Sequence, residues 1–270
     1  MEHLRAHLAM RLERNGDERV RGVLPLSPRC YNADGSLSIG AVATMVDVAV
    51  VSGTHDAHRD RFDGGVVTSH LALRMFGSPT GSSLCAEGVA VRVGRGGIVG
   101  RSYVRDGDGT VVGLVVASST ALAGGGSSHR RNPDRVNDMF AVRASPTDGP
   151  SMDEYMALEP VGVDGVRRLY RLPFHERLRN VNSVLHGGGA CLIIEHAARC
   201  AAKDLGLTPF RIDELDVHFL MPGLVGPFTA TVETMPDEGD RRILVVEVLD
   251  DGRDSRRIAF GMAGATLSST

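Results

Sequence analysis

Residues 181–198 read VNSVLHGGGACLIIEHAA, a segment with an internal counterpart elsewhere in the chain. A histidine and three consecutive glycines lead into an apolar run that carries one carboxylate, Glu195, in its middle. A segment that is apolar on nearly every face predicts a helix that is buried on every side. A carboxylate buried in such a helix costs free energy unless it is paired or used. The sequence must therefore give Glu195 either a partner or a chemical task.

The stretch has a counterpart in the first half of the chain, where Asp47 stands at the position of Glu195 (195 − 47 = 148). After the apolar segment the offset falls to 144, so that TSHLALRMFGSP (68–79) aligns with IDELDVHFLMPG (212–223). A short deletion in a surface loop produces such a slip at little thermodynamic cost. Two copies of one structural unit are therefore predicted. The other matching pairs are Leu24 and Leu172, Pro25 and Pro173, Asn32 and Asn180, Leu37 and Leu185, Gly40 and Gly188, and Ala49 and Ala197.

Each copy shows the same order of predicted elements: a glycine-bearing loop, a helix, and a run of strands. The helices are expected in GAVATMVDVAVVSGTH (40–55) and GGGACLIIEHAARCAAKD (187–204). Turn sequences such as RDGDGT (105–110) and DDGRDS (250–255) join neighbouring strands as hairpins. One buried helix against a four- or five-stranded antiparallel sheet, present twice, is an α+β architecture. The strand-like segments are 66–76, 84–94, 98–106 and 110–122 in the first copy and 213–221, 228–235, 242–250 and 256–267 in the second.

Four parts are predicted along the chain. Residues 1–20 form an amphipathic N-terminal helix, 21–122 the first repeat, 123–165 a linker and 166–270 the second repeat. The linker is inferred from a stretch rich in Gly, Ser, Pro and charge. Its HRR triplet at 129–131 is either a solvated segment or a contact for a phosphate group.

Composition narrows the possible classes of protein. The 270 residues are 42% hydrophobic, carry a net charge of −3 and have a pI of about 6.4, which gives no electrostatic attraction to nucleic acid or anionic membranes. The mixed charges of the N-terminal segment do not fit a leader peptide, so the cytoplasm is the expected location. The four cysteines lack the spacing of metal ligands, and we expect reduced thiols and no metal site. These are Cys30, Cys85, Cys191 and Cys200.

LHGGGACLIIEHAA (185–198) resembles the HGG-x6-D/E signature of hotdog-fold acyl-CoA thioesterases of the phenylacetate-pathway type. Asn180 stands where that family often carries an Asn. The first copy departs from the signature, since Ser38 and Ile39 replace the His and the Gly. The resemblance covers about 21–122 and 166–268, and the tandem is similar to double-hotdog thioesterases, in which one chain reproduces a dimer. It implies a tandem (double) hotdog fold, each repeat being an antiparallel sheet wrapped around one long buried helix.

The resemblance also implies two sites between the repeats, each joining the glycine loop of one repeat to the carboxylate of the other. The first site joins Asp47 and Thr68 to the loop residues Asn180, His186 and Gly187. The second site joins Glu195 to Asn32, Ser38 and Ile39. This second site lacks the histidine, and Ile212 replaces the strand hydroxyl of Thr68. We therefore expect it to be degenerate.

The chemistry of the first site follows from its residue types. The backbone N–H groups at the start of a buried helix are well placed to hold a developing oxyanion, so the Gly187 amide is the expected donor. Asp47 is the expected general base or nucleophile, and Thr68 the hydroxyl that positions water. A mid-helix acid has a structural alternative, which is to cap a neighbouring loop or to bond a buried hydroxyl. Cys191 and Cys200 are expected to be packing residues of the helix.

The predicted function is hydrolysis of an acyl-CoA to free CoA and a carboxylic acid, with no cofactor beyond the substrate. Two alternatives share the fold, namely a non-catalytic acyl-CoA binding or sensing module and an enoyl-CoA hydratase or dehydratase. The chain is expected to be a monomeric pseudo-dimer or to pair into a homodimer. The identity of the acyl group is not encoded in any motif of the sequence.

Overall fold

A computed structural model describes residues 3–15, 19–58, 61–62, 65–122, 149–174, 176–180, 183–236 and 239–267. Most of the predicted linker, including the HRR triplet at 129–131, lies outside these residues. Within the described ranges, every helix is either too short or too polar to cross a membrane.

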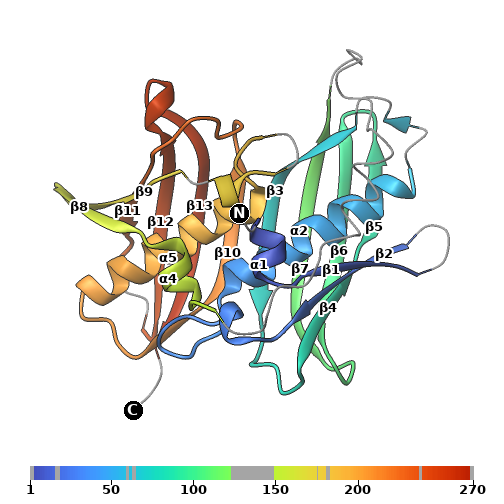
Figure 1. Cartoon of the computed structure of the whole chain (residues 1–270), viewed down its shortest axis with the longest axis horizontal. Helices are drawn as coiled ribbons and strands as arrows, with labels where there is room; N and C mark the ends of the chain where they lie inside the picture. Colours follow the sequence, from blue (N-terminus) through green and yellow to red (C-terminus); the bar gives the residue numbers. More distant parts are fainter. Residues whose placement is uncertain are drawn as a thin grey trace.

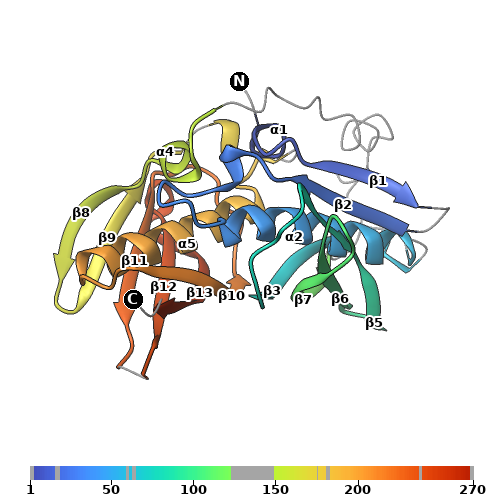
Figure 2. The same cartoon turned by 90° about the horizontal axis from the view of Figure 1, so that it is seen from below.

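Two helices of 18 residues form the centre of the molecule, α2 (Ile39–Asp56) and α5 (Gly187–Asp204). Both were predicted, and most of their residues are buried. They run in opposite directions, with their N-terminal halves next to each other and the sheet curving around them (Figures 1 and 2). Their N-terminal turns meet closely, since a Cβ at Gly40 would lie only 2.8 Å from Leu192 Cδ2 and a Cβ at Gly188 would overlap Thr44. The glycines therefore allow the two helices to approach each other at the positions where the candidate sites lie.

The sheet has 13 strands among the described residues, and all pairings are antiparallel. Their order is β1-β2-β4-β6-β7-β3-β10-β13-β12-β11-β9-β8, with β5 paired to β6. The strands of the first repeat surround α2 and those of the second surround α5 (Figure 1). The strands are β1 (Arg11–Asn15), β2 (Arg19–Pro25), β3 (Val66–Met75), β4 (Ser83–Glu87), β5 (Val89–Gly94), β6 (Gly97–Asp106), β7 (Val111–Ala121), β8 (Glu159–Asp164), β9 (Arg167–Leu172), β10 (Phe210–Phe219), β11 (Phe228–Thr234), β12 (Arg241–Asp250) and β13 (Arg256–Leu267).

The two halves have matching local geometry. A bridge between Tyr31 and Leu37 closes the loop before α2, and the same bridge joins Arg179 to Leu185 before α5, at an offset of 148 residues (179 − 31 and 185 − 37). At the seam between the halves, β3 pairs with β10, and Ala72 faces Asp216, its own counterpart at the offset of 144 (216 − 72). Strand pairing about equivalent residues relates the two halves by a local two-fold axis. The internal repeat in the sequence thus has a counterpart in the structure.

The N-terminal segment differs from the helix predicted over residues 1–20. The helix α1 covers only Leu4–His7, and β1 follows as one strand of a hairpin with β2. In β1 the apolar side chain of Leu12 is buried while Arg11 and Glu13 on either side are exposed. This alternation is the two-residue period of a strand, and it is too short to be distinguished from a helical pattern in the sequence.

The end of the predicted linker also differs from expectation. Residues 149–165 contain a short helix, α4 (Met152–Met156), and the strand β8. A capping box between Ser151 and Glu154 starts the helix, and Met152 and Met156 bury their side chains in the core. The second structural unit therefore begins before residue 166.

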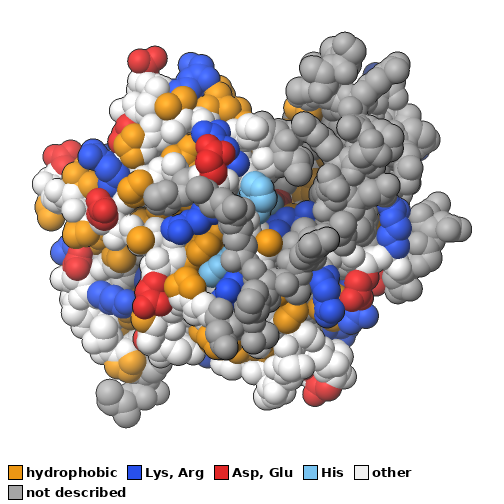
Figure 3. Space-filling model, viewed as in Figure 1, with side chains coloured by type: hydrophobic (Ala, Val, Ile, Leu, Met, Phe, Trp, Pro, Cys, Tyr) orange, Lys and Arg blue, Asp and Glu red, His pale blue; other side chains and the backbone are white. Residues whose placement is uncertain are grey.

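The hydrophobic core is continuous across both halves, because buried residues of α2 and α5 belong to one cluster. All four cysteines are free thiols; Cys30 and Cys191 are fully buried, and Cys85 and Cys200 are half-buried. On the described part of the face shown in Figure 3, positive and negative side chains are interspersed with apolar ones. A shared core means that each half supplies part of the apolar environment of the other.

Candidate active site

Asp47 lies in the third turn of α2 and is only 7% exposed. The Thr68 hydroxyl of β3 donates a hydrogen bond of 2.7 Å to Asp47 Oδ1. A β-bulge between Thr68 and His70 makes this possible. Strict alternation would place both of these residues on one face of the strand, but the extra residue lets Thr68 and Leu71 both turn toward the helix. The structure thus brings together two residues that were predicted to share the first site.

Gly187, the first residue of α5, lies directly against this carboxylate. A Cβ at position 187 would be 2.6 Å from Asp47 Oδ2, so a larger residue would collide with the acid. The N–H groups in the first turn of a helix have no acceptor within the helix, and they stand at its positive end. The carboxylate of one half and the helix N-terminus of the other therefore face the same small region.

His186 is the N-cap of α5, and its Nδ1 accepts a 3.0 Å hydrogen bond from the Gly188 N–H. Burial, and then the charges of Arg5 and His3, lower the pKa of His186 to about 4. The ring is therefore neutral at pH 7, with its proton on Nε2 because Nδ1 is an acceptor. In this position His186 fixes the turn that presents the Gly187 N–H.

The described contacts of Asn180 lie within the loop before α5. Its side-chain oxygen accepts from the Val184 N–H at 3.4 Å, and its backbone N–H donates to the Val184 carbonyl at 2.8 Å. Asn180 thus shapes the approach to the helix.

Burial raises the pKa of Asp47 to about 6, and the hydrogen bond from Thr68 opposes this rise. A carboxyl with a pKa near 6 is largely ionised at pH 7, yet it is a much stronger base than an exposed aspartate. A general base is most effective when its pKa lies near the working pH. The environment of Asp47 therefore suits proton abstraction.

The second site is arranged differently, although its four predicted residues do come together. Glu195 is fully buried and accepts four hydrogen bonds. Its Oε2 accepts from Ser38 Oγ at 2.5 Å and from the Gly40 N–H at 2.9 Å. Its Oε1 accepts from the Ile39 N–H at 3.1 Å and from Asn32 Nδ2 at 3.4 Å. Glu195 therefore caps the N-terminus of α2 and occupies the donors that an oxyanion would need.

The length of the acidic side chain accounts for the contrast between the two sites. Glutamate has one methylene more than aspartate, and Glu195 reaches the backbone N–H groups of the opposing helix. Asp47 instead ends beside Gly187 and is bound by Thr68. In the second site Ile212 takes the place of Thr68, is 5% exposed and has no hydroxyl to offer. Glu195 thus has the structural role considered for a mid-helix acid, because it caps a neighbouring segment and binds a buried hydroxyl.

A buried ion network next to the second site was missed in the sequence. Arg199 of α5 is 1% exposed and binds Asp34 in the loop before α2 at 2.7 Å. His196 Nδ1 lies 2.9 Å from an oxygen of Asp153 in α4, and the other oxygen of Asp153 accepts from the Ala33 N–H at 2.8 Å. The signal in the sequence was the pair His196 and Arg199, which follow Glu195 in a largely apolar helix. The network ties the segment before the second repeat to the loop of the first repeat.

No family model matches the sequence, and no curated protein matches it. Solved structures do match. A conserved protein with a hot dog fold from Alicyclobacillus acidocaldarius aligns with a TM-score of 0.60 and 14% identity over 100% of both chains. The chain shares the hotdog fold. Acyl-CoA thioesterase II from Mycobacterium marinum has a TM-score of 0.62 and 14% identity, over 99% of this chain and 97% of that one.

A second named thioesterase is similar to the same extent. The 12:0-ACP thioesterase from Umbellularia californica has a TM-score of 0.64 and 12% identity, over 93% of this chain and 94% of that one. At these identities the likeness concerns the fold alone.

Proposed function

We propose that the protein is a double-hotdog thioesterase that hydrolyses an acyl-CoA to free CoA and a carboxylic acid at the first site. The observation that carries the proposal is the placement of the buried Asp47 carboxylate directly against Gly187 at the N-terminus of α5. Thioester hydrolysis requires a base or nucleophile on one side of the carbonyl carbon and a hydrogen-bond donor for its oxygen. These two groups come from opposite halves of the chain, so the site lies between the repeats.

In the proposed reaction the Gly187 N–H binds the carbonyl oxygen of the thioester. Asp47 takes a proton from a water molecule held by Thr68, and the water oxygen attacks the carbonyl carbon. The resulting oxyanion is stabilised at the positive end of α5. Its collapse breaks the C–S bond, and the proton on Asp47 passes to the departing thiolate. Direct attack by Asp47 would give an anhydride, which water would then hydrolyse.

We assign no turnover to the second site. Catalysis there would require Glu195 to release the N–H groups of Ile39 and Gly40, which it binds at 3.1 and 2.9 Å. Release would leave buried donors without partners, at about 1–3 kcal/mol each. The proposed enzyme therefore has one active site for each chain.

The names of the structural neighbours include both acyl-CoA and acyl-ACP thioesterases. The HGG motif with its acid nine residues on favours acyl-CoA, since it resembles the phenylacetate-pathway type. We propose a monomeric pseudo-dimer or a homodimer as the functional assembly, because one chain already supplies both halves of the site.

The test is release of free thiol from a panel of short, medium, long-chain and aryl acyl-CoAs, with acyl-ACPs in parallel. Turnover that Asp47→Asn abolishes and Glu195→Gln retains supports the proposal. Binding of acyl-CoA without thiol release would indicate a sensing module. A change in enoyl absorbance without thiol release would indicate a hydratase.

A further inference from the structure

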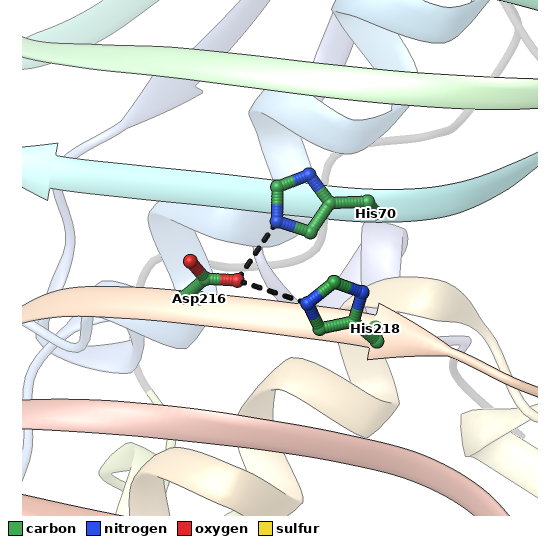
Figure 4. A group of neighbouring side chains, drawn as sticks. All are labelled: His70, Asp216 and His218. Atoms are coloured by element: carbon green, nitrogen blue, oxygen red, sulfur yellow. Dashed lines mark hydrogen bonds and ion pairs between the residues drawn. The ribbon is translucent and has the colours of Figure 1, made fainter.

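His70, Asp216 and His218 form a cluster on the outer face of the sheet, where the two halves meet. His70 belongs to β3 and the other two residues to β10. His70 and His218 are direct partners across these antiparallel strands, and Asp216 lies two residues before His218 on the same face. Figure 4 shows both imidazole rings directed toward the Asp216 carboxylate.

The spacing of these groups is close to that of a metal site. His70 Nε2 lies 2.8 Å from Asp216 Oδ1, and His218 Nε2 lies 3.7 Å from the same oxygen. The three ligand atoms all lie within 4.8 Å of one another. Around a Zn²⁺ ion with bonds of about 2.0–2.2 Å, neighbouring ligand atoms are roughly 3–3.5 Å apart. Small side-chain rotations would therefore place all three atoms at bonding distance from one ion.

The cluster is accessible to solvent. The side chains of His70, Asp216 and His218 are 27%, 31% and 51% exposed. The cations nearest in the strand register are already paired, because Glu214 binds both Arg74 and Arg241. On the other side of the local two-fold axis, Glu214 and Arg74 occupy the positions equivalent to His70 and His218 and form an ion pair. An ion pair therefore links β3 to β10 on one side of the axis, and the cluster of His70, Asp216 and His218 links these strands on the other side.

We propose that His70, Asp216 and His218 bind one divalent transition-metal ion, such as Zn²⁺ or Co²⁺, that links the two halves across the β3–β10 seam. Two imidazoles and one carboxylate suit such ions, and water completes the coordination. The site faces solvent on the opposite side of the sheet from Asp47, and the proposal is independent of the hydrolytic function.

The test uses the full chain after chelator treatment and removal of the chelator. Titration with Co²⁺ should give visible absorption bands that saturate at one ion for each chain, and Zn²⁺ should displace the Co²⁺. Removal of a residue that only orients a metal ligand costs about 10–100-fold in affinity, so loss of a ligand should cost at least about 100-fold. His70→Ala, His218→Ala and Asp216→Asn should each show this loss.

His58→Ala is the matched control, because His58 is a half-exposed histidine outside the cluster. It should bind like the wild type, and Zn²⁺ should raise the melting temperature of the wild type and of this control only. Wild-type protein that binds no Co²⁺ at millimolar concentration would overturn the proposal and leave only a His–Asp hydrogen bond. The same conclusion would follow if folded His70→Ala and His218→Ala kept wild-type affinity.

Discussion

Replacing Glu195 by glutamine tests whether this acid is a structural cap. The change keeps the shape of the side chain but replaces one acceptor oxygen by an NH₂ group. Two of the four donors, either Ser38 Oγ and the Gly40 N–H or Asn32 Nδ2 and the Ile39 N–H, then face another donor. A buried donor left without a partner costs about 1–3 kcal/mol, and hydrogen bonds to a charged group are the stronger ones. We expect a loss of ~3 kcal/mol in the free energy of unfolding.

The matched control is Asp47→Asn, the same acid-to-amide change at the equivalent position of the other repeat. Burial raises the pKa of Asp47 to about 6, so the folded state binds protons more tightly than the unfolded state between about pH 4 and 6. Ionised Asp47 therefore destabilises the fold above pH 6. Asp47→Asn should raise stability at pH 8, by up to about 2 kcal/mol, and should have less effect at pH 4.

The assay is thermal or urea unfolding of both variants at pH 8, with thiol release measured on the folded protein. A loss of ~3 kcal/mol corresponds to a fall of roughly 6–12 °C in melting temperature for a chain of this size. Glu195→Gln should also keep its turnover per folded molecule. The reasoning fails if Glu195→Gln melts at the wild-type temperature, or if the two amide variants are destabilised equally.

Three further predictions concern the first site. Asp47→Ala should lower kcat for thiol release by about 10²–10⁴-fold while the protein stays folded by circular dichroism, and wild-type turnover would refute its assignment as base or nucleophile. The rate of thiol release by the wild type should rise about tenfold per pH unit below pH 6 and level off above pH 6. The reason is that burial raises the pKa of Asp47 to about 6 and the base must be ionised. A pH–rate profile that is flat from pH 4.5 to 8 would contradict this. His186→Ala should lower stability by about 0.5–2 kcal/mol through loss of the N-cap and should reduce kcat less than Asp47→Ala, whereas an equal loss in a folded protein would indicate direct chemistry by the imidazole.

The long helices and strands are predicted well from the sequence, because each contains many residues that follow one hydrophobic pattern. The bounds of α5 match the apolar segment 187–204, since three glycines mark its start and Gly206 follows its end. Asn32, Ser38 and Ile39, which are grouped with Glu195 from the sequence, all donate hydrogen bonds to its carboxylate. Their grouping followed from the resemblance to double-hotdog thioesterases, in which the glycine loop of one repeat meets the carboxylate of the other.

The parts that could not be predicted depend on single residues or on contacts between distant segments. The bulge beside Ser69 decides that Thr68 faces Asp47, and no residue there signals a bulge. Whether Glu195 is a base or a cap depends on the reach of one methylene group. His70 and His218 are 148 positions apart and become neighbours only through the register of β3 and β10. No local spacing rule could have connected them.

One of the two equivalent helices carries Asp and the other carries Glu. This difference bears on which substitutions a two-repeat chain can accept during evolution. In a dimer of identical subunits every substitution occurs twice, so an acid lengthened to cap a helix would close both sites at once. Joining two copies in one polypeptide removes this constraint, because each position is encoded separately. In this chain the Glu195 carboxylate caps the N-terminus of α2, whereas the Asp47 carboxylate leaves the N-terminus of α5 uncapped by an acid, a difference that a symmetric pair of identical chains could not hold.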